Sequence, residues 1–198
     1  FRDDYYQIQN RMPNLMSIDM TNVTMESLPD NFFSRRTALL EIKLPKVLKS
    51  IGYGAFNECY GLTSLVLPEE LTTINNNAFY YCKDLKSINL PASLVTMGRE
   101  SFYECTSLQS IAIPEKVTVI EDYTFYNCAS LSEVKLPAGL SEIKGYAFAY
   151  CRALTSIELP DALTFLRSQA FRECSGLTEI TLPASLQYCD YPFYNCSN

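Results

Sequence analysis

The sequence predicts a right-handed solenoid of about eight stacked coils, and three observations lead to this fold class. A period of 23 residues runs through most of the chain, four residue types keep the same register, and no insertion or deletion interrupts it between Leu39 and Leu177. A fixed period of this length is typical of architectures that stack one short unit per repeat. The four series are Leu39, Leu62, Leu85, Leu108, Leu131, Leu154 and Leu177; Pro45, Pro68, Pro91, Pro114, Pro137, Pro160 and Pro183; Phe33, Phe56, Phe79, Phe102, Phe125, Phe148, Phe171 and, one residue early, Phe193; and Cys59, Cys82, Cys105, Cys128, Cys151, Cys174 and Cys196.

The period also divides the chain into segments. Six complete repeats fill residues 39–176, a shortened one fills 177–198, and a degenerate one fills 15–38. Residues 1–14 are more polar and less regular. Because the open end of a solenoid exposes its core to water, we expect this flank to act as an N-terminal cap.

The first part of each repeat predicts a short strand. In the repeat that begins at Leu62, the order L-x-x-L-x-L alternates at its end, so that Leu65 and Leu67 point inward and their neighbours point to solvent. Pro68 follows at once, and it ends the strand because proline has no N–H to give to a ladder. Strands from successive repeats are therefore expected to form a parallel sheet along one side of the stack.

The rest of the repeat predicts the opposite side. Leu71 and Ile74 are spaced for a second short extended segment, and Ala78-Phe79-x-x-Cys82 has the spacing of a single helical or 3₁₀ turn. One coil alone buries almost nothing. When coils stack, each side chain meets its equivalent above and below, which predicts columns of leucine, isoleucine, phenylalanine and cysteine as one continuous core.

The repeat L-x-x-I-x-L-P-x-x-L-x-x-I-x-x-x-A-F-x-x-C closely resembles the 23-residue, Treponema-type class of leucine-rich repeats, the BspA-like family, over residues 39–196. The resemblance implies a leucine-rich repeat solenoid, α/β or mainly β. It also implies a bacterial or protist protein that is secreted or displayed at the cell surface and that adheres to other macromolecules. The family has no shared catalytic residues to transfer to this chain.

Composition and charge exclude several classes of protein. With 47% hydrophobic and 19% charged residues, the chain has the composition of a folded domain. No apolar run is long enough to cross a bilayer, so we expect no membrane insertion of this chain. The net charge is −6 and the basic residues are scattered, so we expect no nucleic-acid partner.

The sequence predicts no enzyme and no cofactor. Histidine is absent from all 198 residues, which removes Ser-His-Asp and Cys-His catalysis and the common zinc hydrolases. Carboxylate chemistry stays open, but the acidic residues are dispersed and no recurring pair stands out. The chain also has no glycine-rich phosphate loop. We therefore expect no catalytic residues.

The cysteines have two possible roles, as buried free thiols or as partners in disulfides. A cysteine that recurs once per coil beside a phenylalanine is expected to be a buried free thiol, with one or two disulfides as the alternative. We expect no metal site, because a tetrahedral zinc needs four converging ligands and the column offers two neighbours. Cys189 occupies a position held elsewhere by Ile74 or Met97, and it is expected to be a core substitution.

Two surfaces are candidates for binding a partner. The first is the outward side of the predicted strands, which we call the strand face; its alternative interpretation is an ordinary solvated sheet, since it lacks the Trp, Tyr and Arg typical of binding hot spots. Its candidate contact residues are Ser64, Ser87, Asn89, Ser110, Glu133, Lys135, Ser156 and Glu158.

The second surface is an aromatic column. Tyr80, Tyr103 and Tyr126 each follow a phenylalanine of the repeat, and other tyrosines such as Tyr123 and Tyr146 are expected close by. Tyrosine is amphipathic and enriched at interfaces, so such a column could meet a glycan or a protein. The alternative is that the rings only pack over one another.

From these residues we expect a monomeric, non-catalytic, secreted or cell-surface module that binds an unidentified protein or glycan over an extended face. The first alternative is a structural spacer within a larger surface protein. A carbohydrate-active enzyme is a more distant one.

Overall fold

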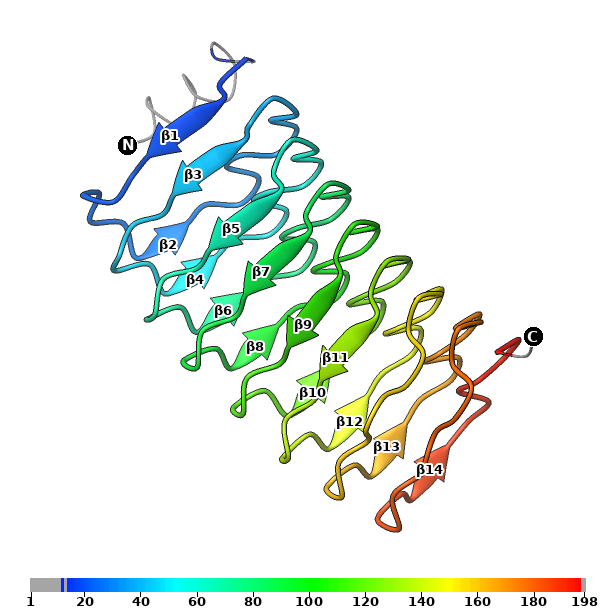
Figure 1. The fold of residues 1–198 in the computed structure, drawn as a ribbon. Helices are drawn as coiled ribbons and strands as arrows, with labels where there is room; N and C mark the ends of the chain where they lie inside the picture. The colour runs from blue at the N-terminus through cyan, green and yellow to red at the C-terminus, as the bar shows by residue number, and fades with distance from the viewer. Residues whose placement is uncertain (1–11, 13, 197–198) are drawn as a thin grey trace.

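The computed structural model describes residue 12 and residues 14–196, and these form a parallel β-solenoid (Figure 1). The cap expected at residues 1–14 therefore lies almost entirely outside the described residues. Two rows of short strands run along the stack. The first row holds β1 (Ser17–Asp19), β3 (Glu41–Lys43), β5 (Ser64–Val66), β7 (Ser87–Asn89), β9 (Ser110–Ala112) and β11 (Glu133–Lys135). The second row holds β2 (Ser27–Leu28), β4 (Ser50–Ile51), β6 (Thr73–Ile74), β8 (Thr96–Met97), β10 (Val119–Ile120), β12 (Glu142–Ile143), β13 (Phe165–Leu166) and β14 (Tyr188–Cys189).

Strand pairing follows the 23-residue period. Ser64 is opposite Ser87 in the first row, and Thr73 is opposite Thr96 in the second. The second row forms two four-stranded parallel sheets, so the described residues contribute eight coils to it. In the first row the last two coils, at residues 156–158 and 179–181, keep the alternation of exposed and more buried side chains but form no strand.

A column of phenylalanines forms the centre of the core. The ring of Phe79 stacks between those of Phe56 and Phe102, with 5.1 Å between centroids on each side and nearly parallel ring planes. All three side chains are fully buried. The stacking predicted from the period is therefore confirmed, and each coil gains a core from its neighbours that it could not form alone.

The expected helical or 3₁₀ turn is wrong in detail, because the described residues contain no helix there. The segment after β4 is a run of β-turns, in which Asn57 N–H donates to the Gly54 carbonyl (2.9 Å) and Cys59 N–H to the Phe56 carbonyl (3.1 Å). Gly54 and Glu58 have left-handed backbones with φ of 56° and 57°, which stops the turns from continuing as a helix. Phe56 N–H donates instead to Ala78 of the next coil (2.8 Å).

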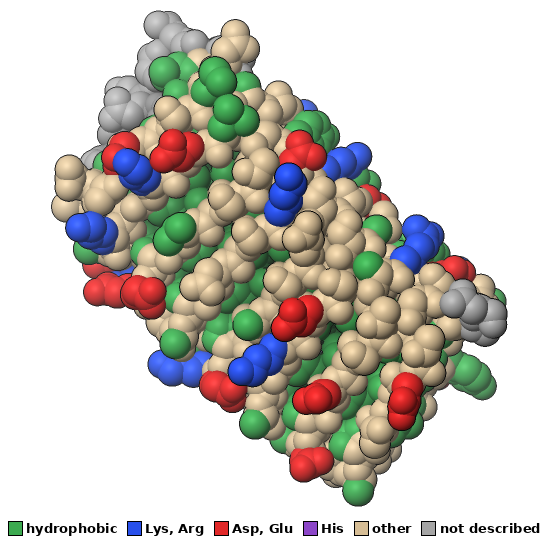
Figure 2. Space-filling model, viewed as in Figure 1, with side chains coloured by type: hydrophobic (Ala, Val, Ile, Leu, Met, Phe, Trp, Pro, Cys, Tyr) green, Lys and Arg blue, Asp and Glu red, His purple; other side chains and the backbone are tan. Residues whose placement is uncertain are grey.

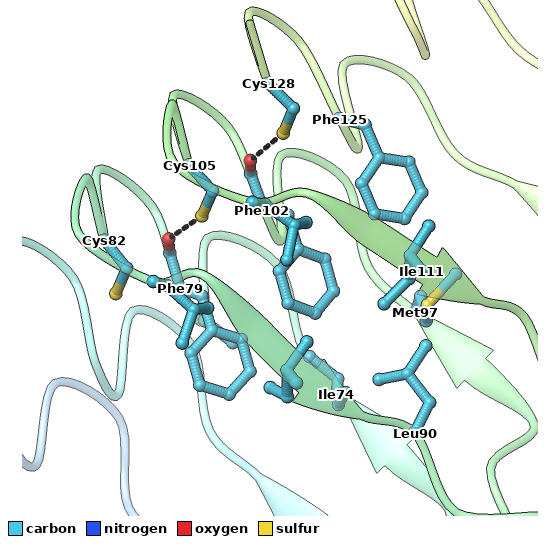
Figure 3. Packing of buried hydrophobic residues seen from close by; sticks show 14 of the residues in the cluster. Ile74, Phe79, Cys82, Leu90, Met97, Phe102, Cys105, Ile111, Phe125 and Cys128 are labelled. Atoms are coloured by element: carbon cyan, nitrogen blue, oxygen red, sulfur yellow. Dashed lines mark hydrogen bonds between the residues drawn. The ribbon is translucent and has the colours of Figure 1, made fainter. Parts of the chain in front are cut away.

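The thiols of the cysteine column donate hydrogen bonds to backbone carbonyls of the preceding coil, although they lie in an apolar core. Cys105 Sγ donates to the carbonyl of Phe79 (3.2 Å), and Cys128 Sγ to the carbonyl of Phe102 (3.2 Å) (Figure 3). Each of these carbonyls also accepts the N–H of the cysteine in its own coil, as Phe79 does from Cys82. The thiol thus satisfies a second lone pair of a buried carbonyl. The expected buried free thiols are confirmed for Cys59, Cys82, Cys105, Cys128, Cys151 and Cys174.

Cys189 does not behave as the core substitution expected from its position. It lies on β14, where it pairs with Leu166 of β13, but its side chain is exposed. Leu166 is fully buried because it has a coil on each side, whereas the described residues place a coil on only one side of Cys189.

Ser101 provides a test of how the core uses polar groups. It is fully buried at a position that other coils fill with alanine, and no described residue offers its hydroxyl a hydrogen bond. Because an unpaired buried hydroxyl is costly, we expect Ser101→Ala to raise the free energy of unfolding by about 1 kcal/mol in urea titrations. The alanines at the equivalent position are Ala55, Ala78, Ala147 and Ala170.

Thr124 is the matched control for this substitution. It occupies the same position in the next coil and is also fully buried, but its hydroxyl donates to the Glu121 carbonyl (2.8 Å). Thr124→Ala should therefore destabilise the chain. Equal effects of the two substitutions would contradict the distinction.

Candidate binding surfaces

The strand face is built by the alternation of side chains along the first row. Ile88 of β7 is buried, while Ser87 and Asn89 on either side of it are exposed. Pairing in register then places Ser64 beside Ser87 and, two coils further, Ser110 beside Glu133. The exposed side chains therefore form straight lines across the stack, perpendicular to the strands.

Six of the eight predicted strand-face residues line one shallow hollow of about 420 Å³ over β5, β7, β9 and β11. Its middle carries small uncharged side chains, and charge begins at Glu133 and Lys135. Figure 2 views this face, and its charged side chains lie mainly towards the two ends. The six residues that the structure brings together are Ser64, Ser87, Asn89, Ser110, Glu133 and Lys135.

The remaining two, Ser156 and Glu158, do not line this hollow but lie next to its charged end. Both are exposed, but the coil that carries them forms no strand. They line a second hollow of about 540 Å³ with Glu133, Lys135 and Asp161. This end of the strand face is therefore acidic and differs in character from the middle.

The opposite end of the strand face combines exposed apolar side chains with the charged ones of Glu41, Lys43 and Lys46. A hollow of about 470 Å³ over β3 and β5 is lined by Leu40, Ile42 and Val66. The side chain of Val66 is 82% exposed, and that of Leu40 is also exposed. Sequence reasoning placed Val66 on this face but did not count it as a contact residue. Its bare methyl groups, next to a line of serines, add apolar area to the surface.

The aromatic column has the predicted arrangement, but both faces of its central ring are occupied. Tyr103 stacks on Tyr80 at 4.8 Å and on Tyr126 at 4.6 Å between centroids, with nearly parallel planes. Tyr81 packs edge-on against Tyr80, and Tyr150 edge-on against Tyr126, so the two outer rings each have a further tyrosine neighbour. A partner therefore cannot stack on either face of Tyr103, the central ring.

Burial favours the protonated form of the three tyrosine hydroxyls in this column. Each of its three rings is half-buried, and desolvation raises the pKa of the Tyr103 hydroxyl above its usual range. The hydroxyls of Tyr80 and Tyr126 have pKa values raised for the same reason. The column consequently stays neutral and protonated at physiological pH.

A third surface was missed by sequence reasoning. It lies on the second row, where a hollow of about 560 Å³ is lined by Tyr123, Tyr146, Arg167 and Tyr188. The rings of Tyr123 and Tyr146 stack at 4.9 Å, as expected for neighbouring tyrosines. The signal that could have found it is the first residue of each second-row strand, which changes from serine or threonine to a large side chain along the chain.

Neither an activated thiol nor a metal-binding cluster is found among the described residues. Burial raises the pKa of the Cys59 thiol to about 12, so it stays protonated and is a poor nucleophile. Within residues 14–196 no group of three or more acidic, cysteine or histidine side chains is arranged to hold a metal ion. Over the same residues, no helix is long and apolar enough to span a bilayer.

A family model described as the BspA type leucine-rich repeat region matches the chain in six copies, over residues 6–118 and 95–198. The chain belongs to the BspA-type leucine-rich repeat family. Members of this family are often surface or binding proteins and are generally non-catalytic. No curated protein matches this BspA-type chain.

Solved structures agree with this family and with the solenoid fold. A leucine-rich repeat protein from Eubacterium ventriosum is 26% identical with a TM-score of 0.76 over 86% of this chain, and the chain spans 45% of that protein. The leucine-rich repeat protein of T. pallidum, TpLRR, is 28% identical with a TM-score of 0.61, covering 71% of this BspA-type chain and 72% of its own. The pneumococcal vaccine antigen PcpA, 17% identical with a TM-score of 0.56 over 91% of this chain and 56% of its own, shares the fold.

Proposed function

We propose that the protein is a non-catalytic, monomeric binding module, secreted or held at a cell surface, that contacts a macromolecular partner through its strand face. The observation that carries this proposal is the row of shallow hollows that crosses β3, β5, β7, β9 and β11. A surface repeated every coil on a rigid stack offers many weak contacts at fixed spacing, which suits an extended partner.

The chemistry of the face favours a protein partner. Apolar groups at Val66 and Leu40 lie beside a line of hydroxyl and amide groups at Ser64, Ser87 and Asn89. A mixture of apolar and neutral polar groups is the usual composition of a protein interface. Charge at either end, as in the pair of Asp19 and Lys43 (3.3 Å) and at Glu133, can set the orientation of the partner.

The test is a panel of purified extracellular-matrix proteins and a glycan array, probed with the chain and with a charge-insertion variant. Ser87→Arg and Ser110→Arg place two bulky cations in the middle of the face at exposed positions, so the fold should persist. We expect capture of the partner to fall at least about tenfold, as a like-charge or steric clash of about 1.4 kcal/mol would produce.

Thr63→Arg and Gln109→Arg form a matched control that also adds two cations, because these exposed, uncharged residues precede strands of the same row and line none of the strand-face hollows described above. Unchanged capture by the Ser87→Arg and Ser110→Arg variant would contradict the proposal. The spacer alternative predicts that the chain captures no member of either panel.

A further inference from the structure

The outer side of the second row changes character along the stack. The first residue of each second-row strand points outward, and in the early coils it is small: Ser50 in β4, Thr73 in β6 and Thr96 in β8. In the last three strands the same position holds Glu142, Phe165 and Tyr188. Since the fold accepts serine or threonine there, the larger side chains are not needed to form the strand.

These large side chains fix an arginine. Arg167 lies with its guanidinium carbon 4.8 Å from the centre of the Phe165 ring and 5.0 Å from that of Tyr188. Its Nε donates to a carboxylate oxygen of Glu142 (2.6 Å). Two rings and a carboxylate thus hold one planar group of hydrogen-bond donors in a single orientation, which lowers the entropy lost when a ligand binds to it.

The hollow beside Arg167 is electrically balanced. Its cationic lining groups are Arg99, Lys144 and Arg167, and its carboxylates are Asp122, Glu142 and Asp190. Lys144 Nζ also reaches both oxygens of a fourth carboxylate, Glu121, at 2.9 and 2.8 Å, so the site has no excess of positive charge. This balance opposes strongly anionic ligands such as sulfated chains or nucleic acids, and favours a neutral, hydroxyl-rich one.

We infer that this hollow on the outer side of β12, β13 and β14 binds a neutral oligosaccharide. Carboxylates and a fixed guanidinium can pair with sugar hydroxyls, while aromatic rings pack against the C–H faces of pyranose rings. Tyr188, which lines the hollow, is 43% exposed, so its ring has uncovered surface that Tyr103 lacks. The volume of about 560 Å³ matches small-ligand sites, which commonly measure roughly 300–1,000 Å³.

The inference goes beyond the proposed strand-face function, because the hollow lies on the other row of strands. It can be tested independently of any binding at the strand face. The probe is an array of neutral hexose and pentose oligosaccharides, with sulfated and uronic-acid oligosaccharides alongside. Binding is followed by tyrosine fluorescence, because the chain has 14 tyrosines and no tryptophan whose emission would mask theirs. We expect at least one neutral oligosaccharide to bind and to change this fluorescence.

The decisive variant replaces Glu142, Phe165 and Tyr188 with threonine, the residue that Thr73 and Thr96 show the fold to accept at this position. We expect it to lose at least tenfold in affinity for the neutral oligosaccharide. Tyr188→Thr alone, at a position already exposed, serves if the triple variant does not fold. The strand-face Ser87→Arg and Ser110→Arg variant should bind the oligosaccharide as the parent does.

The outcomes separate the two proposals. This site is supported if the threonine variant loses oligosaccharide binding and the strand-face variant retains it. That conclusion holds whether or not the strand face binds a partner. The inference is overturned if the parent chain binds no neutral oligosaccharide, if it binds only the sulfated or uronic-acid members, or if the threonine variants bind as well as the parent.

Discussion

Replacing Phe102 with alanine is expected to lower the free energy of unfolding by about 3–5 kcal/mol, the usual cost of deleting a buried aromatic ring. Phe102 is fully buried and stacks on Phe79 at 5.1 Å and on Phe125 at 5.5 Å. The substitution therefore removes contacts on both sides and leaves a cavity between two coils. Because each coil is stabilised mainly by its neighbours, the loss should also weaken cooperation between the two halves of the stack.

Urea unfolding followed by circular dichroism measures this effect. Phe193→Ala is the control, because Phe193 is only half-buried and stacks on one described ring, that of Phe171 at 5.7 Å. Its loss should be clearly smaller. If both substitutions cost the same, the phenylalanine column is not the principal source of stability.

Raising the pH above 9 is expected to unfold the protein steeply. Six buried thiols carry the effect, and burial raises the pKa of Cys59 and Cys174 from 9.0 to about 12 and those of the other four well above 9.0. A thiol whose folded pKa is raised stabilises the fold fully below the unfolded pKa and loses that contribution as the pH rises towards the folded one. Six such protons change the free energy of unfolding by about 8 kcal/mol per pH unit.

A typical folding free energy of about 5–15 kcal/mol would be exhausted within about two pH units, so we expect a midpoint between about pH 10 and 11. The measurement is circular dichroism from pH 7 to 12 under a reducing agent. A variant with Cys82, Cys105 and Cys128 replaced by alanine should lose about 4 kcal/mol per pH unit of this dependence, since three of the six thiols are gone. The half-buried tyrosines, whose pKa values are also raised, contribute equally in both chains. An unchanged slope in that variant would refute the role of the thiols.

The period of the sequence predicted the core and the pairing register because both depend on which side chain meets which neighbour. Phe79 and Cys105 lie where a 23-residue repeat requires. The same reasoning failed for the turn between Phe56 and Cys59, because two residues three apart fit a helical turn and a β-turn equally well. The feature that decides is the left-handed backbone at Glu58, and glutamate carries no sequence signal for that conformation.

The candidate sites were only partly predictable. The alternation in the repeat gave the strand face, but the hollow at Val66 depends on how neighbouring side chains leave it exposed. The site at Arg167 was missed because its members come from three coils, and their chemistry becomes visible only when Glu142, Phe165 and Tyr188 are compared with the threonines at the same position.

The most direct test of the account is whether equivalent side chains in successive repeats touch. Nuclear Overhauser effects between phenylalanine ring protons measure this in solution with a phenylalanine-labelled chain. Cross-peaks from the ring of Phe79 to those of both Phe56 and Phe102 are the predicted result. If the Phe79 ring shows contacts only within its own repeat, the coils do not stack in the 23-residue register, and the surfaces built on that register do not exist.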